Sequence, residues 1–322
     1  MKTDNNWHIF KGDGRKPHEQ IKKLNQTVPA PKWRGKDVPY LPTTEEIASV
    51  NASIYLRRPL LLTGSPGTGK SSLAKEIARE LKLDFLYWAI NSKSTLEEGL
   101  YEYDAISRLQ DVQNKDEKPL NEYVKLGALG EAFSKGKKCV LLIDELDKSD
   151  VDLPNDLLHI LEENAFDIPV LKRYKKEKKV NLGTEKEPIW ISEGTHKISI
   201  ENMPIIIITS NRERDFSPAF MRRCLAHHIE FPEPKRLVEI ACRHLEFGYS
   251  EKEKSKEQKE IEFLVDEFMN KRNGAGAYKD KHELSIDQLL NALYLRLKGE
   301  AKVDFSNKSI FNRNVWHNLE GN

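Results

Sequence analysis

Residues 64–71 read GSPGTGKS and follow the spacing GxxxxGK[ST], which suits the binding of phosphate groups. Glycines let backbone N–H groups close around phosphate oxygens, and a helix that starts immediately afterwards adds the partial positive charge of its N-terminus. In this pattern the lysine reaches the β- and γ-phosphates and the final hydroxyl ligates Mg²⁺. A glycine-rich turn that happens to contain a lysine is the alternative. The candidate ATP-binding residues are Gly64, Ser65, Pro66, Gly67, Thr68, Gly69, Lys70, Ser71 and Ser72, with Ser71 also a metal ligand.

A second group of reactive side chains ends the apolar run CVLLIDELDK, residues 139–148. Asp144 and Glu145 fall at the carboxyl end of an expected buried strand, which is the end where open α/β sheets bind ligands. One carboxylate can hold Mg²⁺ while its neighbour polarises an attacking water. We therefore predict Asp144 as the metal residue and Glu145 as the base, against an ordinary acidic pair at a strand end. Asp147 lies past the strand and is expected to cap the following turn.

A third group lies in PIIIITSNRERDFSPAFMRRC, residues 204–224. Asn211 places an amide directly after a strongly apolar run, and the paired arginines Arg222 and Arg223 follow a proline. An amide at a strand end can simply cap the next turn. The residue types alone leave a structural role and a chemical role open for all three side chains.

The elements that must position these groups can be read from the apolar pattern. Between about residues 41 and 235, amphipathic helical segments separate the apolar runs PLLLTG, DFLYWAI, CVLLIDE, PIIIITSN and AHHIEF. Continuous apolar strands of this kind indicate a parallel sheet with helices on both faces. After residue 235 the pattern is helical only, which predicts a smaller domain over residues 236–322. Residues 1–40 show no sustained period and are expected to form an extended arm pinned to a surface by Trp7 and Trp33.

The composition narrows the classes of function. With 52 basic and 51 acidic residues the net charge is +1, so no global field attracts nucleic acid or an anionic membrane. No apolar run reaches the roughly 18 residues that a membrane span needs, and the N-terminus has no signal-peptide pattern. The cysteines Cys139, Cys224 and Cys242 have no metal-binding spacing and are expected to be core thiols in a reducing cytosol. We expect a soluble, cytoplasmic protein.

Three motifs in this order, GSPGTGKS, LLIDELDK and IIITSN…FMRRC, followed by a small helical domain, resemble those of AAA+ ATPases. Within that superfamily, DELDKSDVDLPNDLLHILEE, YVKLGALGEAF and SPAFMRRC resemble the MoxR group over about residues 40–297. The arm WHIFKGDGRKPHE with PKWRG resembles MoxR-like ATPases encoded in bacterial conflict and defence gene clusters. The resemblance implies a five-stranded αβα nucleotide-binding domain with a helical lid, assembled as a ring, typically a hexamer, with ATP at the subunit interfaces.

The resemblance also implies roles for the third group. Asn211 matches the sensor-1 position, where its amide orients the water that attacks the γ-phosphate. Arg223 matches the arginine that reaches the γ-phosphate bound by the neighbouring subunit, whereas Arg222 is expected to form a structural ion pair. The alternative is that both arginines pair with surface carboxylates. Many lids of this superfamily start their third helix with an arginine, but the matching segment here reads KDKHELSIDQLL, in which Lys281 or His282 could substitute, or the site could lack this sensor.

Two segments, about residues 95–125 and 165–200, lie where the MoxR group carries insertions. Short alternating runs such as PIWIS and HKISI in the second segment predict β-hairpins. Its basic cluster, residues 172–179, surrounds Tyr174 and fits a solvated loop tip better than a nucleic-acid site, because it holds one aromatic residue and no recognisable binding fold. His227 and His228 lack a third ligand nearby and are expected to be structural.

These observations predict Mg²⁺-dependent ATP hydrolysis in an oligomeric ring that remodels or activates a partner protein. The resemblance to the MoxR group implies a partner with a von Willebrand factor A domain. A motor or loader stimulated by nucleic acid is one alternative. A nucleotide-gated switch in a signalling or defence complex, which binds ATP and hydrolyses it slowly, is another.

Overall fold

The computed structural model describes residues 40–116, 118–173, 179–182, 189–273 and 285–297. The chain divides into two compact units. One unit comprises residues 42–64 and 69–229 and contains the sheet. The other contains Ser65–Thr68 and the helices that follow residue 230. The predicted roles of Trp7, Trp33, Tyr174, Lys281 and His282 fall outside the described residues.

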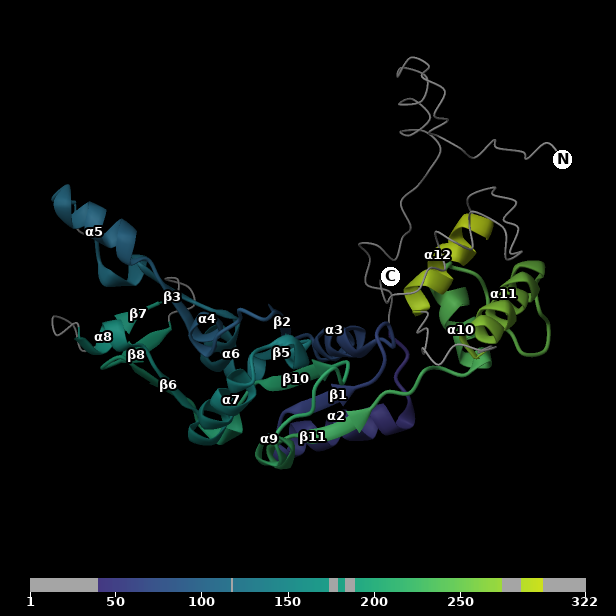
Figure 1. Cartoon of the computed structure of the whole chain (residues 1–322), viewed down its shortest axis with the longest axis horizontal. Helices are drawn as coiled ribbons and strands as arrows, with labels where there is room; N and C mark the ends of the chain where they lie inside the picture. Colours follow the sequence, from purple (N-terminus) through teal and green to yellow (C-terminus); the bar gives the residue numbers. More distant parts are fainter. Residues whose placement is uncertain (1–39, 117, 174–178, 183–188, 274–284, 298–322) are drawn as a thin grey trace, which may run out of the picture. The chain divides into compact units, whose positions relative to one another are not determined.

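The first unit is built on a five-stranded sheet with the order β11-β1-β10-β5-β2 (Figure 1). Every neighbouring pair is parallel. The strands coincide with the five apolar runs, so the predicted parallel α/β architecture is confirmed. They are β1 (Leu60–Thr63), β2 (Asp84–Ala89), β5 (Cys139–Asp144), β10 (Ile205–Ser210) and β11 (Leu225–His228).

Helices cover both faces of this sheet. On one face α2 (Thr44–Leu56) packs against β1 and β11, and α3 (Lys70–Leu81) packs against β5, β10 and β2. The opposite side chains of the same strands, such as Leu61, Leu141 and Ile208, join a buried core with Phe133 and Phe220. These two phenylalanines belong to α6 (Ala128–Lys135) and α9 (Pro218–Arg223), and α7 (Asp152–Glu163) contributes to the same core. Full burial of β1, β5 and β10 explains why these runs carry almost no polar residues before their last positions.

Two insertions interrupt this framework. The first contains α4 (Leu96–Leu100), β3 (Tyr101–Tyr103), α5 (Ala105–Gln113), the 3₁₀ turn η1 (Leu120–Glu122) and β4 (Val124–Leu126), and β3 pairs with β4 in antiparallel fashion. The second contains β6 (Ala165–Asp167), α8 (Pro169–Arg173), β7 (Lys179–Asn181), β8 (Trp190–Ser192) and β9 (Thr195–Lys197). Its strands form an antiparallel sheet with the order β6-β9-β8-β7. The hairpins predicted for the second insertion are therefore confirmed.

The second unit contains the helices α10 (Pro234–His244), α11 (Lys256–Asn273) and α12 (Ile286–Leu297). Their apolar faces form a separate core that includes Leu237, Ala241, Ile261, Phe268 and Leu293. Helical spacing of the apolar residues predicted these three segments, and the structure confirms them.

The three cysteines are buried and unbridged, as predicted. Burial raises the pKa of Cys139 and of Cys224 to about 12, and that of Cys242 to about 11, so all three thiols stay protonated near neutral pH. Among the described helices none is both long and apolar enough to cross a bilayer.

Candidate active site

The glycine-rich segment connects the end of β1 at Thr63 with the start of α3 at Lys70. Gly67 has a φ of 75° and Gly69 a φ of 94°, both in the left-handed region that glycine adopts without a steric penalty. No side chain caps the N-terminus of α3, so the backbone N–H groups of its first turn have no side-chain acceptor at the cap. This is the geometry that binds phosphate at a helix N-terminus.

The lysine of this segment is held against the loop it follows. Lys70 is only 6% exposed, and its Nζ donates to the carbonyl oxygen of Gly64 at 2.7 Å. Thr68 Oγ1 donates to the carbonyl oxygen of Ser65 at 2.9 Å. Ser71 and Ser72 lie in the first turn of α3. The ammonium group is thus held at the loop, which lowers the entropic cost of ordering it around a phosphate.

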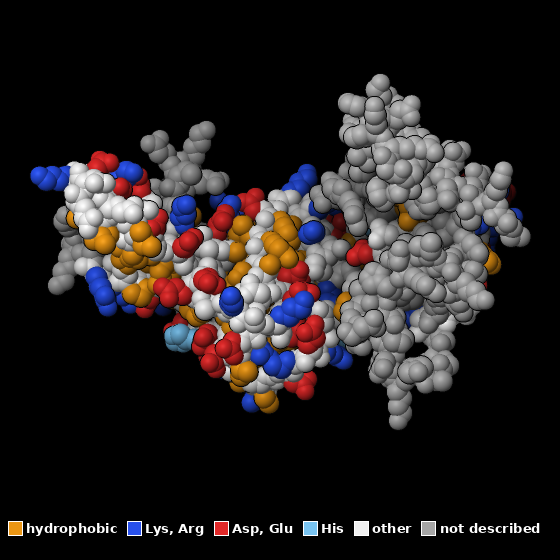
Figure 2. Space-filling model, turned by 45° about the horizontal axis from the view of Figure 1, so that its top comes forward, with side chains coloured by type: hydrophobic (Ala, Val, Ile, Leu, Met, Phe, Trp, Pro, Cys, Tyr) orange, Lys and Arg blue, Asp and Glu red, His pale blue; other side chains and the backbone are white. Residues whose placement is uncertain are grey.

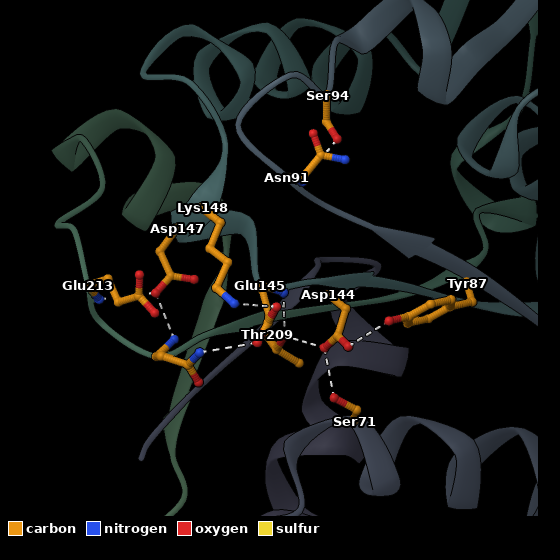
Figure 3. A network of polar contacts seen from close by, with 11 residues as sticks. Ser71, Tyr87, Asn91, Ser94, Asp144, Glu145, Asp147, Lys148, Thr209 and Glu213 are labelled. Carbon is orange, nitrogen blue, oxygen red and sulfur yellow. Dashed lines mark hydrogen bonds and ion pairs between the residues drawn. The ribbon is translucent and has the colours of Figure 1, made fainter. Parts of the chain in front are cut away.

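Asp144, the last residue of β5, accepts three hydrogen bonds from neighbouring elements (Figure 3). Its Oδ1 accepts from Ser71 Oγ at 2.7 Å and from Thr209 Oγ1 at 2.6 Å. Its Oδ2 accepts from the hydroxyl of Tyr87 at 3.2 Å. The sheet order explains this meeting, because β2 and β10 flank β5 and bring Tyr87 and Thr209 to the same edge. Burial and the Asp144 carboxylate raise the pKa of Tyr87, so its hydroxyl remains a donor.

The oxygens of Ser71 and Asp144 fit the site predicted for a metal ion. A hydroxyl and a carboxylate from a helix N-terminus and a strand end are hard oxygen donors, which Mg²⁺ prefers to nitrogen or sulfur. They already lie within hydrogen-bonding distance of each other, at 2.7 Å. No cluster of three or more His, Cys, Asp or Glu side chains that could hold a metal occurs elsewhere among the described residues.

Glu145 follows β5 with a φ of 61°, a left-handed conformation that is strained for a residue with a side chain. Thr209 Oγ1 stabilises this conformation by accepting the backbone N–H of Glu145 at 2.8 Å. The carboxylate is 41% exposed, and it accepts from Lys148 Nζ at 2.8 Å and from Asn211 Nδ2 at 3.4 Å. The hydrogen bond to Glu145 raises the pKa of Lys148. The predicted base and the predicted sensor amide therefore face each other.

The expectation for Asp147 is wrong. Its carboxylate caps neither its own 3₁₀ turn η3 (Leu146–Lys148) nor the start of α7, both of which lack a side-chain cap. Asp147 Oδ2 instead accepts the backbone N–H groups of Asn211 at 2.8 Å and of Glu213 at 3.0 Å. Those groups belong to the turn after β10, which lies beside β5 in the sheet, so the partners are close in space and distant in sequence.

The arginine pair lies at the end of α9. Arg223 forms an ion pair with Glu162 of α7, and its side chain is 41% exposed. Arg222 donates to the carbonyl oxygen of Pro218 at 3.1 Å, and no ion pair within the described part of the chain includes it. The expected ion pair of Arg222 is therefore wrong, because α7 packs against α9 and presents Glu162 to Arg223. An ion pair as exposed as this one contributes at most about 1 kcal/mol, so Arg223 can leave it at little cost.

Sequence reasoning did not find Thr209, Tyr87 or Lys148. The sequence contained a signal for Thr209, because it is a polar residue within an apolar run. In the structure Thr209 is fully buried. The sequence contained no such signal for Tyr87, whose hydroxyl reaches Asp144 only through the pairing of β2 with β5. His227 and His228 accept or donate hydrogen bonds with the hydroxyls of Ser49 and Thr63, each at 3.0 Å, which agrees with structural roles.

Comparison with known proteins gives one family and several more distant likenesses. The model of the AAA domain, dynein-related subfamily, matches residues 59–224, just over half of the chain. The chaperone protein ClpB of Prochlorococcus marinus is 24% identical over 256 residues. That match covers 75% of this chain and 28% of ClpB, so the chain spans only a minor part of this curated relative.

Two solved structures of NtrX from Brucella abortus are also similar. One has a TM-score of 0.44 at 15% identity and covers 90% of this chain and 56% of NtrX. The other, a complex with ADP, has a TM-score of 0.40 at 16% identity and covers 87% and 56%. TM-scores this low support no transfer of properties from NtrX to this chain.

Proposed function

We propose that this chain, which belongs to the dynein-related AAA domain family, is an ATPase that hydrolyses ATP with Mg²⁺ in a ring that remodels a partner protein. One observation carries this proposal. At the carboxyl edge of the sheet Asp144 accepts hydrogen bonds from the hydroxyls of Ser71 and Thr209, and the Thr209 hydroxyl accepts the backbone N–H of Glu145. Lys70 lies beside Ser71 at the start of α3. The phosphate-binding segment and the candidate base therefore meet at the same edge of the sheet.

Each residue at this edge has a definable task. Lys70 and the N–H groups at the start of α3 bind the phosphates, and Ser71 with Asp144 would hold Mg²⁺. When bound, the ion neutralises charge that develops on the phosphate oxygens. Glu145 accepts a proton from the attacking water, and Asn211, whose amide reaches Glu145 Oε1, orients that water. Glu145 has a left-handed backbone and its carboxylate is 41% exposed, so water can reach it.

Two substitutions test the assignment of the site. Lys70→Ala should abolish nucleotide binding, because it removes the cation that contacts the ground-state phosphates. Glu145→Gln should keep nucleotide affinity within about three-fold of the wild type and lose turnover, because the base acts on the water alone. Fluorescent-nucleotide titration and steady-state phosphate release measure the two quantities. Equal nucleotide affinity in wild type and Lys70→Ala would contradict the assignment of Lys70 to phosphate binding.

The proposal also includes assembly into a ring, in which Arg223 of one subunit acts on the nucleotide bound by its neighbour. Resemblance to the MoxR group supports a cytoplasmic hexamer with ATP at its interfaces, and it also supports a partner with a von Willebrand factor A domain. In this proposal Arg223, which ends α9 and is 41% exposed, reaches the γ-phosphate bound by a neighbouring subunit. Nucleic acid is not part of this proposal, because the net charge is only +1.

The helix α5 supports contact with a protein partner, because its apolar side chains face solvent and its charged side chains face the rest of the insertion. Ile106, Leu109 and Val112 are 73%, 60% and 46% exposed. The charged residues Arg108 and Asp111 instead face the insertion, where they bond to the hydroxyls of Tyr103 at 3.1 Å and Tyr123 at 2.9 Å. Hydrophobic side chains gather at the end of the molecule that carries α5, at the left of Figure 2.

The uncharged character of the exposed face of α5 indicates which kind of partner surface can bind it. The exposed residues of α5 are Ala105, Ile106, Leu109, Gln110, Val112 and Gln113, none of which is charged. A partner surface with charged groups would lose their hydration here without gaining a counter-charge. We therefore assign this face to an uncharged, apolar surface of the client protein, and the substitution that tests it is given below.

A second candidate function, the slow nucleotide-gated switch, is favoured by the contact between Lys148 and Glu145. A base that is already paired at 2.8 Å is less available to water. Steady-state turnover measured beside nucleotide affinity separates the two functions. A switch would bind ATP tightly and hydrolyse it no faster than about once per hour, whereas a remodelling ATPase falls nearer the range of about 1 to 1,000 per second that is typical of enzymes.

A further inference from the structure

Asp147 is a buried carboxylate that the mechanism above does not use. Its side chain is 5% exposed, and it lies two residues after the candidate base. Only one of its oxygens is bonded within the described part of the chain. Oδ2 accepts the N–H groups of Asn211 and Glu213, whereas Oδ1 is buried without a hydrogen-bond partner.

The turn that Asp147 binds is conformationally strained. Arg212, between the two donors, has a φ of 62°, a left-handed conformation that is strained for a residue with a Cβ. Its own N–H donates to Ser210 Oγ at 3.0 Å. Hydrogen bonds from two backbone groups to one buried carboxylate help to hold such a turn. Asp147 therefore determines where the chain leaves β10.

That exit point sets the position of Asn211. The Asn211 amide is 3.4 Å from Glu145 Oε1, at the outer limit of a hydrogen bond, so a small displacement of the turn would break the contact. Glu145 and Asp147 belong to the same short segment after β5, whereas Asn211 follows β10. The carboxylate of Asp147 is the direct link, among the described residues, between this segment and the backbone of Asn211.

We propose that Asp147 is a positioning residue, whose carboxylate fixes the turn 211–213 and thereby holds the Asn211 amide at the Glu145 carboxylate. The unbonded Oδ1 is an argument against a purely stabilising role, because a buried acceptor without a donor destabilises the fold. This inference rests on the proposed roles of Glu145 and Asn211.

The test is a double-mutant cycle on the full-length chain, with kcat and KM for ATP measured for wild type, Asp147→Ala, Asn211→Ala and the double variant. Asp147→Ala should lower kcat between about 10-fold and about 100-fold, because a misplacement of about 1 Å at a reacting centre costs up to about 100-fold. KM should stay within about three-fold, since the phosphate-binding residues are untouched. In the Asn211→Ala background, Asp147→Ala should cause no further loss.

Asp147→Asn is the conservative control, because it keeps an acceptor oxygen for the two N–H groups. It should stay within about three-fold of the wild-type kcat, and it keeps the inference testable if Asp147→Ala does not fold by circular dichroism and thermal unfolding. A folded Asp147→Asn variant that loses as much kcat as Asn211→Ala would overturn the inference.

The double-mutant cycle distinguishes a wrong role for Asp147 from a wrong role for Asn211. If Asp147→Ala lowers kcat equally in the wild-type and Asn211→Ala backgrounds, Asp147 does not act through Asn211 and the inference is wrong, while the ATPase site stands. If Asn211→Ala retains the wild-type kcat, the role of Asn211 in the proposed function is wrong as well.

Discussion

The carboxyl edge of β5 and β10 and the helix α5 are built in opposite ways. At the edge, polar side chains from different strands bond to one another, and the buried Thr209 hydroxyl bonds to both Asp144 and Glu145. In α5, the charged side chains Arg108 and Asp111 bond inward to tyrosines and apolar side chains face solvent. The first arrangement fixes positions within the chain, and the second leaves a surface that can gain free energy only by binding something outside it.

Arg223 fits neither arrangement, because it is exposed and is nevertheless expected to act in catalysis. Its substitution has the largest expected effect on kcat. Arg223 is 41% exposed, yet action in a neighbouring subunit would make it as important as a buried site residue. Arg223→Ala should lower kcat by roughly 10³ to 10⁵ with the fold intact, because such an arginine stabilises charge that develops during phosphoryl transfer. Arg222→Ala is the matched control and should do much less, since among the described residues its guanidinium bonds to the carbonyl oxygen of Pro218 in the same helix.

Mixed rings test the position of Arg223. Arg223→Ala and Glu145→Gln should each be inactive, and mixing them with demonstrated subunit exchange should restore part of the phosphate release. A mixture that stays inactive would contradict simple action in trans, or would mean that one blocked site stalls the whole ring. Full activity of Arg223→Ala alone would contradict the role outright.

Thr209→Val tests the buried side of the comparison. The substitution keeps the shape of the side chain and removes the hydroxyl that donates to Asp144 and accepts from Glu145. We expect a fall in kcat of about 100-fold, and a stability loss of about 1 to 3 kcal/mol from the unbonded N–H of Glu145. Thr209→Ser retains the hydroxyl and should stay near wild type. Equal activity of the Val and Ser variants would show that the hydroxyl does not organise the site.

Leu109→Gln tests the exposed side. Its matched control is Leu56→Gln in α2, because the two leucines are 60% and 58% exposed. Basal ATP hydrolysis and thermal stability should be unchanged in both variants. Binding of a client purified on the Glu145→Gln protein should weaken by about 10-fold or more in Leu109→Gln alone, as expected for a central apolar contact. A change in oligomeric state by light scattering, with client binding intact, would assign this face to a second copy of the chain instead.

Lys148→Met is expected to have the smallest effect. The Lys148–Glu145 pair is 41% exposed on both sides, so it contributes at most about 1 kcal/mol and its loss should raise basal kcat by no more than about five-fold. Lys138→Met, in an exposed residue on the 3₁₀ turn η2 (Gly136–Lys138), is the control. A large loss of activity in Lys148→Met would instead make the lysine part of the catalytic group.

Much of the fold could be predicted because its signals are local. The five strands of the sheet coincide with apolar runs, of which β1, β5 and β10 are buried, and the helical unit has sustained helical spacing. Phosphate binding, too, could be predicted from residues adjacent in sequence, since a glycine-rich turn and a helix N-terminus suffice for it.

The remaining features depend on contacts between distant residues. Asp147 was misassigned because nothing near it in sequence indicates that its partners are Asn211 and Glu213. The ion pair was assigned to the wrong arginine because the packing of α7 on α9 decides which one meets Glu162. The orientation of α5 was not predicted either, since its apolar spacing is the same whichever face is exposed.

The nucleotide recovered from purified protein after incubation with ATP and Mg²⁺ tests the central claim most directly. Separation by ion-exchange chromatography should give mainly ADP from the wild type, mainly ATP from Glu145→Gln, and no bound nucleotide from Lys70→Ala. These results would mean that phosphate is bound by the segment at Lys70 and cleaved with the help of Glu145. Mainly ADP from Glu145→Gln, in the same proportion as in the wild type, would contradict the account.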